Sequence, residues 1–246
     1  MEPAAPPSRP RTAPVRAVLF DAYGTLFDVY SVSTLAEQLF PGQGERLAVL
    51  WRDKQIEYTR LASMSGAQGE RYRPFWEITR SGLRYAALRL GLALDAAAED
   101  RLMNQYHHLS SFPENKAVLQ ALKARGVPAG ILSNGDPQML EVAVKSAGLD
   151  GLLDPLISVQ SIRRYKTDPA TYALGPAALK LPVRDILFVS SNGWDAIGAT
   201  WFGYTTLWVN RAGLPLEQLD TEPTRIGSSL RAVLDFFPGP PNPTTP

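Results

Sequence analysis

The chain has 246 residues, 45% of them hydrophobic, and 25 Lys and Arg residues against 24 Asp and Glu leave a formal net charge of +1. This balance excludes the clustered basic excess of a nucleic-acid-binding protein. The chain has no cysteine, and His107 and His108 are its two histidines, so disulfides, thiolate zinc sites and a cysteine nucleophile are excluded, and a multi-histidine metal site and a Ser-His-Asp triad are disfavoured.

The two ends of the chain differ in composition from the rest. Residues 1–14 are rich in Pro, Ala and Arg and lack the apolar centre of a signal peptide, and residues 239–246 are rich in Pro. We predict both segments to be disordered extensions. No run of residues is long and apolar enough to span a bilayer, and together with the lack of cysteine this predicts a cytoplasmic protein without a membrane partner.

Each apolar run that predicts a strand stops at a polar residue. The first run leads to Asp21, and its continuous apolar pattern is typical of a strand buried on both faces. Ser133 follows the second run and Ser190 the third. The predicted strands are residues 15–20, 128–132, 185–189 and 204–209, with a shorter one at 156–159.

Helical patterns between these strands predict a parallel sheet with helices on both faces. Two of them, residues 116–125 and 138–147, end at Gly126 and Gly148, where a C-terminal glycine cap is expected. Asp168-Pro169 is typical of a helix start. We therefore predict the α/β class, with a doubly wound, Rossmann-like parallel sheet as the core, in which ligands bind beyond the carboxyl ends of the strands.

The roughly eighty residues between the first strand and the helix at 116–125 are too many for an ordinary connection. Their apolar residues recur at helical spacing, without a further strand pattern. We predict an all-helical cap domain at residues 30–112, inserted into a core domain that consists of residues 15–29 and 113–238. The predicted helices of the cap are residues 33–40, 46–61, 75–90 and 94–109.

The sharpest local signal is F-D-A-Y-G-T-L-F-D at residues 20–28. A carboxylate at the end of a buried strand, followed by a turn, is held in one geometry and partly desolvated, and these conditions suit a nucleophile. A lone Asp in this place more often caps a turn. The assignment of Asp21 therefore depends on the residues at the other strand ends.

Four motifs, in order along the chain, carry a family resemblance. Asp21 and Thr25 form an Asp-x-x-x-Thr pattern, Ser133 stands in I-L-S-N-G, Lys166 stands in R-Y-K-T-D, and S-S-N-G-W-D covers residues 190–195. On these residues the chain resembles the haloacid dehalogenase superfamily over nearly its whole length.

Two departures from the phosphatases of this superfamily bear on the chemistry. Tyr23 stands where those enzymes carry a second Asp as acid, and Ser191 where they carry a metal-binding Asp, so that Asp195 alone remains of that loop's carboxylates. Magnesium prefers octahedral oxygen ligands that include carboxylates, and we therefore predict no metal and no cofactor. The words D-A-Y-G-T-L-F-D-V, L-W-R-D-K-Q-I-E-Y-T and F-V-S-S-N-G-W-D-A resemble the L-2-haloacid dehalogenase branch in particular.

The resemblance implies a hydrolase that converts short (S)-2-haloacids to (R)-2-hydroxyacids with inversion at C2. Asp21 would attack the carbon that bears the halogen and form an ester. Arg52, assisted by Asn134, would accept the halide, where negative charge develops in the transition state. Lys166 would pair with Asp21 and keep it ionised.

Further roles follow from the same resemblance. Ser133 and the backbone amides of residues 22 and 23 would hold the substrate carboxylate. Asp195, with Asn192 and Ser190, would position the water that hydrolyses the ester. The remaining substrate contacts are assigned to Tyr23, Ile56, Phe75, Trp194 and Tyr172, with ordinary core packing as the alternative for the aromatic residues.

Two alternatives remain beside the dehalogenase. One is a small-molecule phosphatase of the same superfamily, which would need magnesium. The other is a catalytically silent binding fold, which would not need the complete motif set. Asp53 and Thr167 stand where relatives more often carry Gln and Pro, and this leaves the efficiency, the accepted chain length and the halogen, fluorine included, open. The predicted partners are a small halogenated carboxylate and halide, with no nucleic acid, and a second copy in a homodimer.

Overall fold

Six parallel strands form one sheet in the computed structural model, which describes residues 14–66 and 69–238. The two predicted extensions, apart from Pro14, lie outside the described residues. The strand order is β3-β2-β1-β4-β5-β6, which confirms the predicted α/β class. The strands are β1 (Ala17–Phe20), β2 (Ala129–Ser133), β3 (Leu156–Ser158), β4 (Ile186–Ser190), β5 (Thr205–Val209) and β6 (Arg225–Gly227).

The burial of the strands explains which of them the sequence could predict. Every residue of β1, β2, β4 and β5 is buried, as a sheet covered on both faces requires. β6 is an edge strand of three residues in which Arg225 and Ile226 are exposed. It has no continuous apolar run, and for that reason the sequence pattern did not reveal it.

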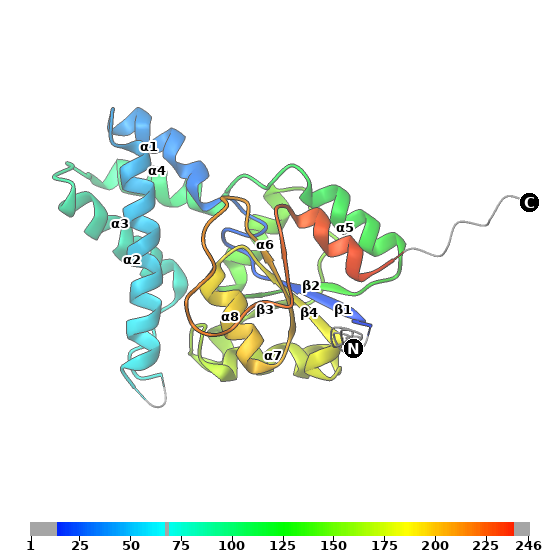
Figure 1. The fold of residues 1–246 in the computed structure, drawn as a ribbon. Coiled ribbons are helices and arrows are strands. Elements are labelled where there is room, and N and C mark those ends of the chain that lie inside the picture. Colours follow the sequence, from blue (N-terminus) through cyan, green and yellow to red (C-terminus); the bar gives the residue numbers. More distant parts are fainter. Residues whose placement is uncertain (1–13, 67–68, 239–246) are drawn as a thin grey trace, which may run out of the picture.

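Helices cover both faces of this sheet. In Figure 1, α5 and η4 lie above the sheet and α7 and α8 lie below it. The predicted glycine caps have the left-handed backbone that such caps need, with φ of 68° at Gly126 and 64° at Gly148. The covering elements are α5 (Asn115–Ala124), α6 (Pro137–Ser146), η2 (Val159–Ile162), α7 (Pro169–Leu179), η3 (Val183–Asp185), α8 (Gly193–Phe202) and η4 (Leu230–Phe236).

A helical layer stands at one side of the sheet, on the left in Figure 1. It consists of η1 (Val29–Val32), α1 (Ser33–Leu39), α2 (Gly44–Met64), α3 (Phe75–Arg89) and α4 (Ala96–His107). Within the described part of residues 30–112 these elements are all helical. The layer coincides with the predicted insertion, and its status as a separate domain stays a prediction.

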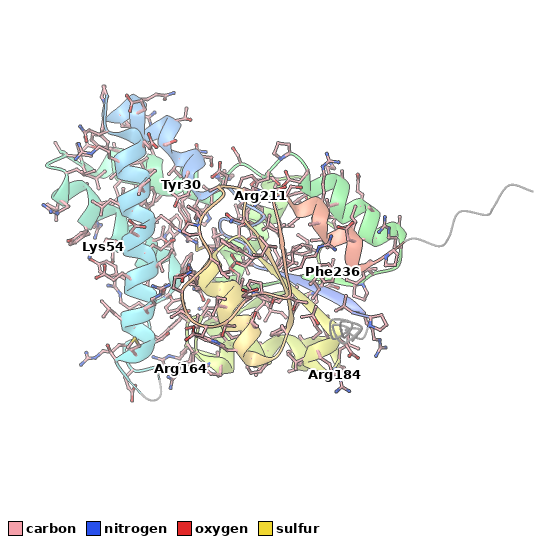
Figure 2. All side chains as sticks on the ribbon, viewed as in Figure 1. Tyr30, Lys54, Arg164, Arg184, Arg211 and Phe236 are labelled. Carbon is pink, nitrogen blue, oxygen red and sulfur yellow. The ribbon has the colours of Figure 1, made fainter. Side chains whose placement is uncertain are left out.

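Hydrogen bonds tie the helical layer to the loops of the sheet. The backbone N–H groups of Phe75 and Trp76, at the start of α3, donate to the carboxylate of Asp136, both at 2.8 Å. The backbone N–H of Tyr165 donates to the Ser63 hydroxyl on α2 at 2.8 Å. Side chains fill the space between α2 and the sheet (Figure 2). No helix of the described chain is both long and apolar enough to cross a membrane.

Candidate active site

Three neighbouring strands bring polar side chains together at their carboxyl ends. β1 pairs with β2 on one side and with β4 on the other. Asp21 follows β1 directly, while Ser133 and Ser190 are the last residues of β2 and β4. The parallel register therefore delivers all three to one edge of the sheet.

Asp21 lies at the centre of this edge, with 5% of its surface exposed. Its Oδ2 accepts hydrogen bonds from Thr25 Oγ1 at 3.0 Å, Ser190 Oγ at 3.3 Å and Asn192 Nδ2 at 2.8 Å. Its Oδ1 accepts from Lys166 Nζ at 3.1 Å. The carboxylate is thus fixed in orientation, and Oδ1 retains more lone-pair capacity than Oδ2.

Lys166 bridges two carboxylates. Its Nζ lies 3.1 Å from Asp21 Oδ1 and 2.9 Å from Asp195 Oδ2, and its side chain is buried completely. Burial alone would lower the pKa of Lys166, but the charges of Asp195 and Asp21 outweigh it and raise that pKa. Lys166 therefore stays protonated and supplies the positive charge between the two carboxylates.

Asp195 is the more deeply buried of the two acids. Desolvation raises its pKa to about 6, against the opposing charge of Lys166. The Tyr172 hydroxyl donates to Asp195 Oδ1 at 2.8 Å. This contact needs a glycine on α8, because a Cβ at Gly198 would lie 2.5 Å from the Tyr172 hydroxyl.

The turn after β1 is the place where the strand ends and α2 come close to each other. Gly24 has a φ of 94°, which side-chain-bearing residues rarely adopt. Across this turn, Asn192 Nδ2 donates to the Tyr23 carbonyl at 3.0 Å and Arg52 Nη2 donates to the same carbonyl at 3.1 Å. The turn is therefore the point at which the helical layer meets the strand ends.

Arg52 reaches the site from α2 and is buried there. Its Nη2 also donates to Asn192 Oδ1 at 3.2 Å, and its Nη1 donates to Gln55 Oε1 at 2.6 Å. All of these acceptors are uncharged. Within the part of the chain that the structure describes, no carboxylate forms an ion pair with Arg52.

A small, nearly closed pocket lies between Arg52 and Asp21, with a cavity volume of about 10 Å³. It has both a polar and an apolar side, as a site for a small carboxylate with a short alkyl chain requires. The lining residues are Asp21, Tyr23, Arg52, Ile56, Thr59, Phe75, Ser133, Asn134, Asn192 and Trp194.

The structure places most of the predicted substrate contacts around this pocket and one elsewhere. Tyr172, which we expected beside the substrate, is absent from the lining and lies behind Asp195 instead. Thr59 was missed, although its spacing from Arg52 and Ile56 puts the three on one face of a helix. Gln55 was also missed, and its contacts depend on three different helices.

The hydrogen bonds of the lining residues leave donors free for a ligand. Asn134 Oδ1 accepts from the Lys166 backbone N–H at 3.0 Å, so its Nδ2 can donate into the pocket. The Ser133 hydroxyl oxygen accepts from the Gly135 N–H at 3.0 Å, which leaves its own proton available. These donors suit an anionic group such as a carboxylate.

A wider cavity lies outside the pocket. It has a volume of about 710 Å³ and shares Ile56 and Trp194 with the pocket. Asp53 and Thr167, the two departures noted in the sequence, both line it. They stand at the mouth of the site and not beside Asp21.

The donor set does not fit the divalent cation on which phosphatases of this fold depend. Lys166 already forms ion pairs with both Asp21 and Asp195 from between them. The Ser191 hydroxyl, at the place of a metal ligand, accepts from Arg211 Nη1 at 2.7 Å. Burial raises the pKa of Tyr23 well above its usual value, so its phenol is no anionic ligand.

Comparisons with known proteins find relatives over most of the chain. The sequence profile of the haloacid dehalogenase-like hydrolases matches residues 15–203. The (S)-2-haloacid dehalogenase of Pseudomonas sp. strain YL is 44% identical over 223 residues, covering 91% of this chain and 94% of that enzyme. A crystal structure of an L-2-haloacid dehalogenase superposes with a TM-score of 0.89 at 60% identity, covering 91% of this chain and 99% of that one. The L-2-haloacid dehalogenase from Xanthobacter autotrophicus, with chloropropionic acid covalently bound, superposes with a TM-score of 0.82 at 35% identity, covering 89% and 96%.

Proposed function

The chain belongs to the haloacid dehalogenase-like hydrolases, and from that premise we propose that it hydrolyses the carbon–halogen bond of short (S)-2-haloacids. The products are halide and the (R)-2-hydroxyacid. The observation that carries this proposal is the pairing of a held carboxylate, Asp21, with an uncompensated cation, Arg52, across a small pocket. Such a pair suits an anionic nucleophile and an anionic leaving group.

In the first step, Asp21 Oδ1 attacks C2 of the substrate. The bond between Oδ1 and C2 forms as the carbon–halogen bond breaks, and the halide leaves with the bonding electron pair toward Arg52. Attack from the side opposite the halogen inverts C2. Asn134, through its free amide, assists Arg52 with the halide, while Ser133 and the backbone amides of residues 22 and 23 hold the substrate carboxylate. Lys166 offsets the repulsion between that carboxylate and Asp21.

In the second step, water hydrolyses the ester on Asp21. The water adds to the ester carbonyl carbon and gives a proton to Asp195, with Ser190 and Asn192 positioning it. The bond from the carbonyl carbon to the ester oxygen then breaks, and the product takes the proton back. Tyr172 and Lys166 hold Asp195 in place for this exchange.

The apolar side of the pocket sets the size of the substrate. Ile56, Phe75 and Trp194 line the pocket, which is small. We infer that the C2 substituent lies against these side chains, and that substrates with a hydrogen or methyl group at C2 react fastest. The cytoplasmic location and the homodimer remain predictions.

Halide release from a panel of short 2-chloro, 2-bromo and 2-fluoro acids tests this function, with and without excess chelator. We expect release from (S)-substrates that persists in chelator, and the (R)-hydroxyacid as product. A single turnover in heavy-oxygen water should place the label in Asp21 and not in the first product molecule. Activity that is lost on chelation and restored by magnesium, together with phosphate-ester hydrolysis, would favour the phosphatase instead. No turnover of either substrate class would favour the binding fold.

A further inference from the structure

Gln55 lies on α2, three residues after Arg52, and the reaction described above gives it no role. Its side chain is buried, with 1% of the residue exposed. It contacts side chains from two other helices as well as Arg52, through Tyr106 on α4 and Thr79 on α3. A buried amide with three polar partners can hold a neighbouring group in a single orientation.

The hydrogen bonds determine which way the Gln55 amide faces. Thr79 donates its hydroxyl proton to the Phe75 carbonyl at 2.7 Å, so its oxygen must accept the bond from Gln55 Nε2, at 2.6 Å. The amide oxygen Oε1 therefore points to the other side. There it accepts from Arg52 Nη1 at 2.6 Å and from the Tyr106 hydroxyl at 3.1 Å.

The lack of charge on the Gln55 amide matters for Arg52 as much as the geometry of their contact. A guanidinium tethered by a carboxylate would share its positive charge with that carboxylate. Gln55 holds Arg52 with an uncharged oxygen, and the other acceptors of Arg52, the Tyr23 carbonyl and Asn192 Oδ1, are uncharged as well. The full charge of Arg52 thus remains available to an anion in the pocket.

We propose that Gln55 is a positioning residue for halide departure, which holds Arg52 toward the leaving halide while leaving its charge uncompensated. The inference rests on the proposed function, since it presupposes that Arg52 accepts the halide. The amide does not touch the substrate, because Gln55 is not among the residues that line the pocket. It acts through Arg52.

A purely structural role for Gln55 makes a different prediction. If the amide only joined α2, α3 and α4, its replacement would lower stability and slow both chemical steps alike. A positioning role acts on halide release alone, and most strongly on the smaller halide, whose charge is more concentrated. The ratio of the two chemical steps and the ratio of chloride to bromide release therefore separate the two roles.

The test is Gln55→Glu, which keeps the size of the side chain and an acceptor for Arg52 but adds a negative charge. We expect release of chloride from 2-chloropropionate to fall by about 100-fold and release of bromide from 2-bromopropionate by about 10-fold, by analogy with the loss of a charge-stabilising donor. Hydrolysis of the ester on Asp21, measured in single turnovers, should stay within about twofold of the unmodified rate. Gln38→Glu is the matched control, because Gln38 is exposed on α1, and it should leave both ratios unchanged.

Thr79→Val is a second variant, in case Gln55→Glu does not fold. It removes the oxygen that orients the amide and keeps a β-branched side chain of the same size. The freed amide can then turn its NH₂ group toward Arg52. We expect chloride release to slow more than bromide release again, but both by less than in Gln55→Glu. Equal slowing of chloride and bromide release in a folded variant would overturn the proposal, as would equal slowing of both chemical steps. If the unmodified protein releases no halide at all, the proposed function fails instead.

Discussion

The strand ends on one side of the pocket, the strand wall, carry three buried charges, those of Asp21, Asp195 and Lys166. The opposite side, the α2 wall, carries one buried charge, that of Arg52. On the strand side, Lys166 bridges Asp21 and Asp195, so the charges compensate one another within the wall and leave a net negative charge. On the α2 side, the hydrogen-bond partners of Arg52 among the described residues are uncharged. The charge of the nucleophile is thus partly offset within its own wall, while Arg52 opposite it keeps its charge for a ligand.

The two walls also differ in how they are held. Parallel pairing of β1 with β2 and β4 fixes the strand ends, and every residue of these strands is buried. The α2 wall is held through a few side-chain links, among them Asp136 to the start of α3 and Ser63 to the Tyr165 backbone. Changes in the strand wall should therefore remove the chemistry, and changes in the α2 wall should tune it.

The largest effect should come from the nucleophile. Asp21→Asn keeps the size of the side chain and can still accept hydrogen bonds at one atom, but an amide is a poor nucleophile. We expect halide release to fall by about six orders of magnitude, as for the removal of another covalent nucleophile. Ion-selective measurement of released halide checks this, with circular dichroism to show that the fold is retained. Retained activity would contradict a covalent step.

Replacement of Lys166, the cation between the two carboxylates, should have the next largest effect, and it should also lower the free energy of unfolding. Lys166→Met leaves two carboxylates buried without their partner, and breaking a buried pair in this way costs about 3–5 kcal/mol of unfolding free energy. Urea denaturation measures the change. Lys145→Met, at an exposed position on α6, is the matched control and should change the unfolding free energy by less than about 0.5 kcal/mol. Equal effects of the two substitutions would show that the strand wall does not need its cation.

The α2 wall is tested by Arg52→Lys. Lysine keeps the positive charge but cannot contact the Tyr23 carbonyl, Asn192 and Gln55 together as the guanidinium does. We expect halide release to slow by about 100-fold, with little change in ester hydrolysis. Rapid-quench measurement of the two steps separates them. If ester hydrolysis slowed as much as halide release, the two walls would not divide the reaction as proposed.

The smallest effect is a shift in the pH dependence of ester hydrolysis. Because burial raises the pKa of Asp195 to about 6, the ionised form that accepts a proton from water is lost as the pH falls through that value. Ester hydrolysis should then fall about tenfold for each further unit of acidification. The Tyr172 hydroxyl bond lowers the pKa of Asp195, so Tyr172→Phe should move this acid limb to higher pH. A limb that did not move would mean that Tyr172 does not act through Asp195.

Sequence patterns predicted the strand ends and the helical layer to different extents. The strand ends were predictable because a buried strand has a continuous apolar run, and the residue after it must lie at the sheet edge, as for Asp21 and Ser133. The helices of the layer were predictable from spacing as well, to within a few residues of α2 and α3. The roles of the residues within the site came from the family resemblance, and those roles stay proposals.

The sequence by itself determined the order of the first five strands along the chain, the glycine caps and the assembly of the motif residues at one sheet edge, because local patterns carry that information. Only the tertiary structure decided that Lys166 is buried between two carboxylates, that Tyr172 lies behind Asp195, and that Gln55 faces Arg52 with its oxygen. Each of these contacts joins elements far apart in the chain. Their burial, hydrogen-bond direction and pKa depend on the groups that folding brings together, and no local pattern encodes them.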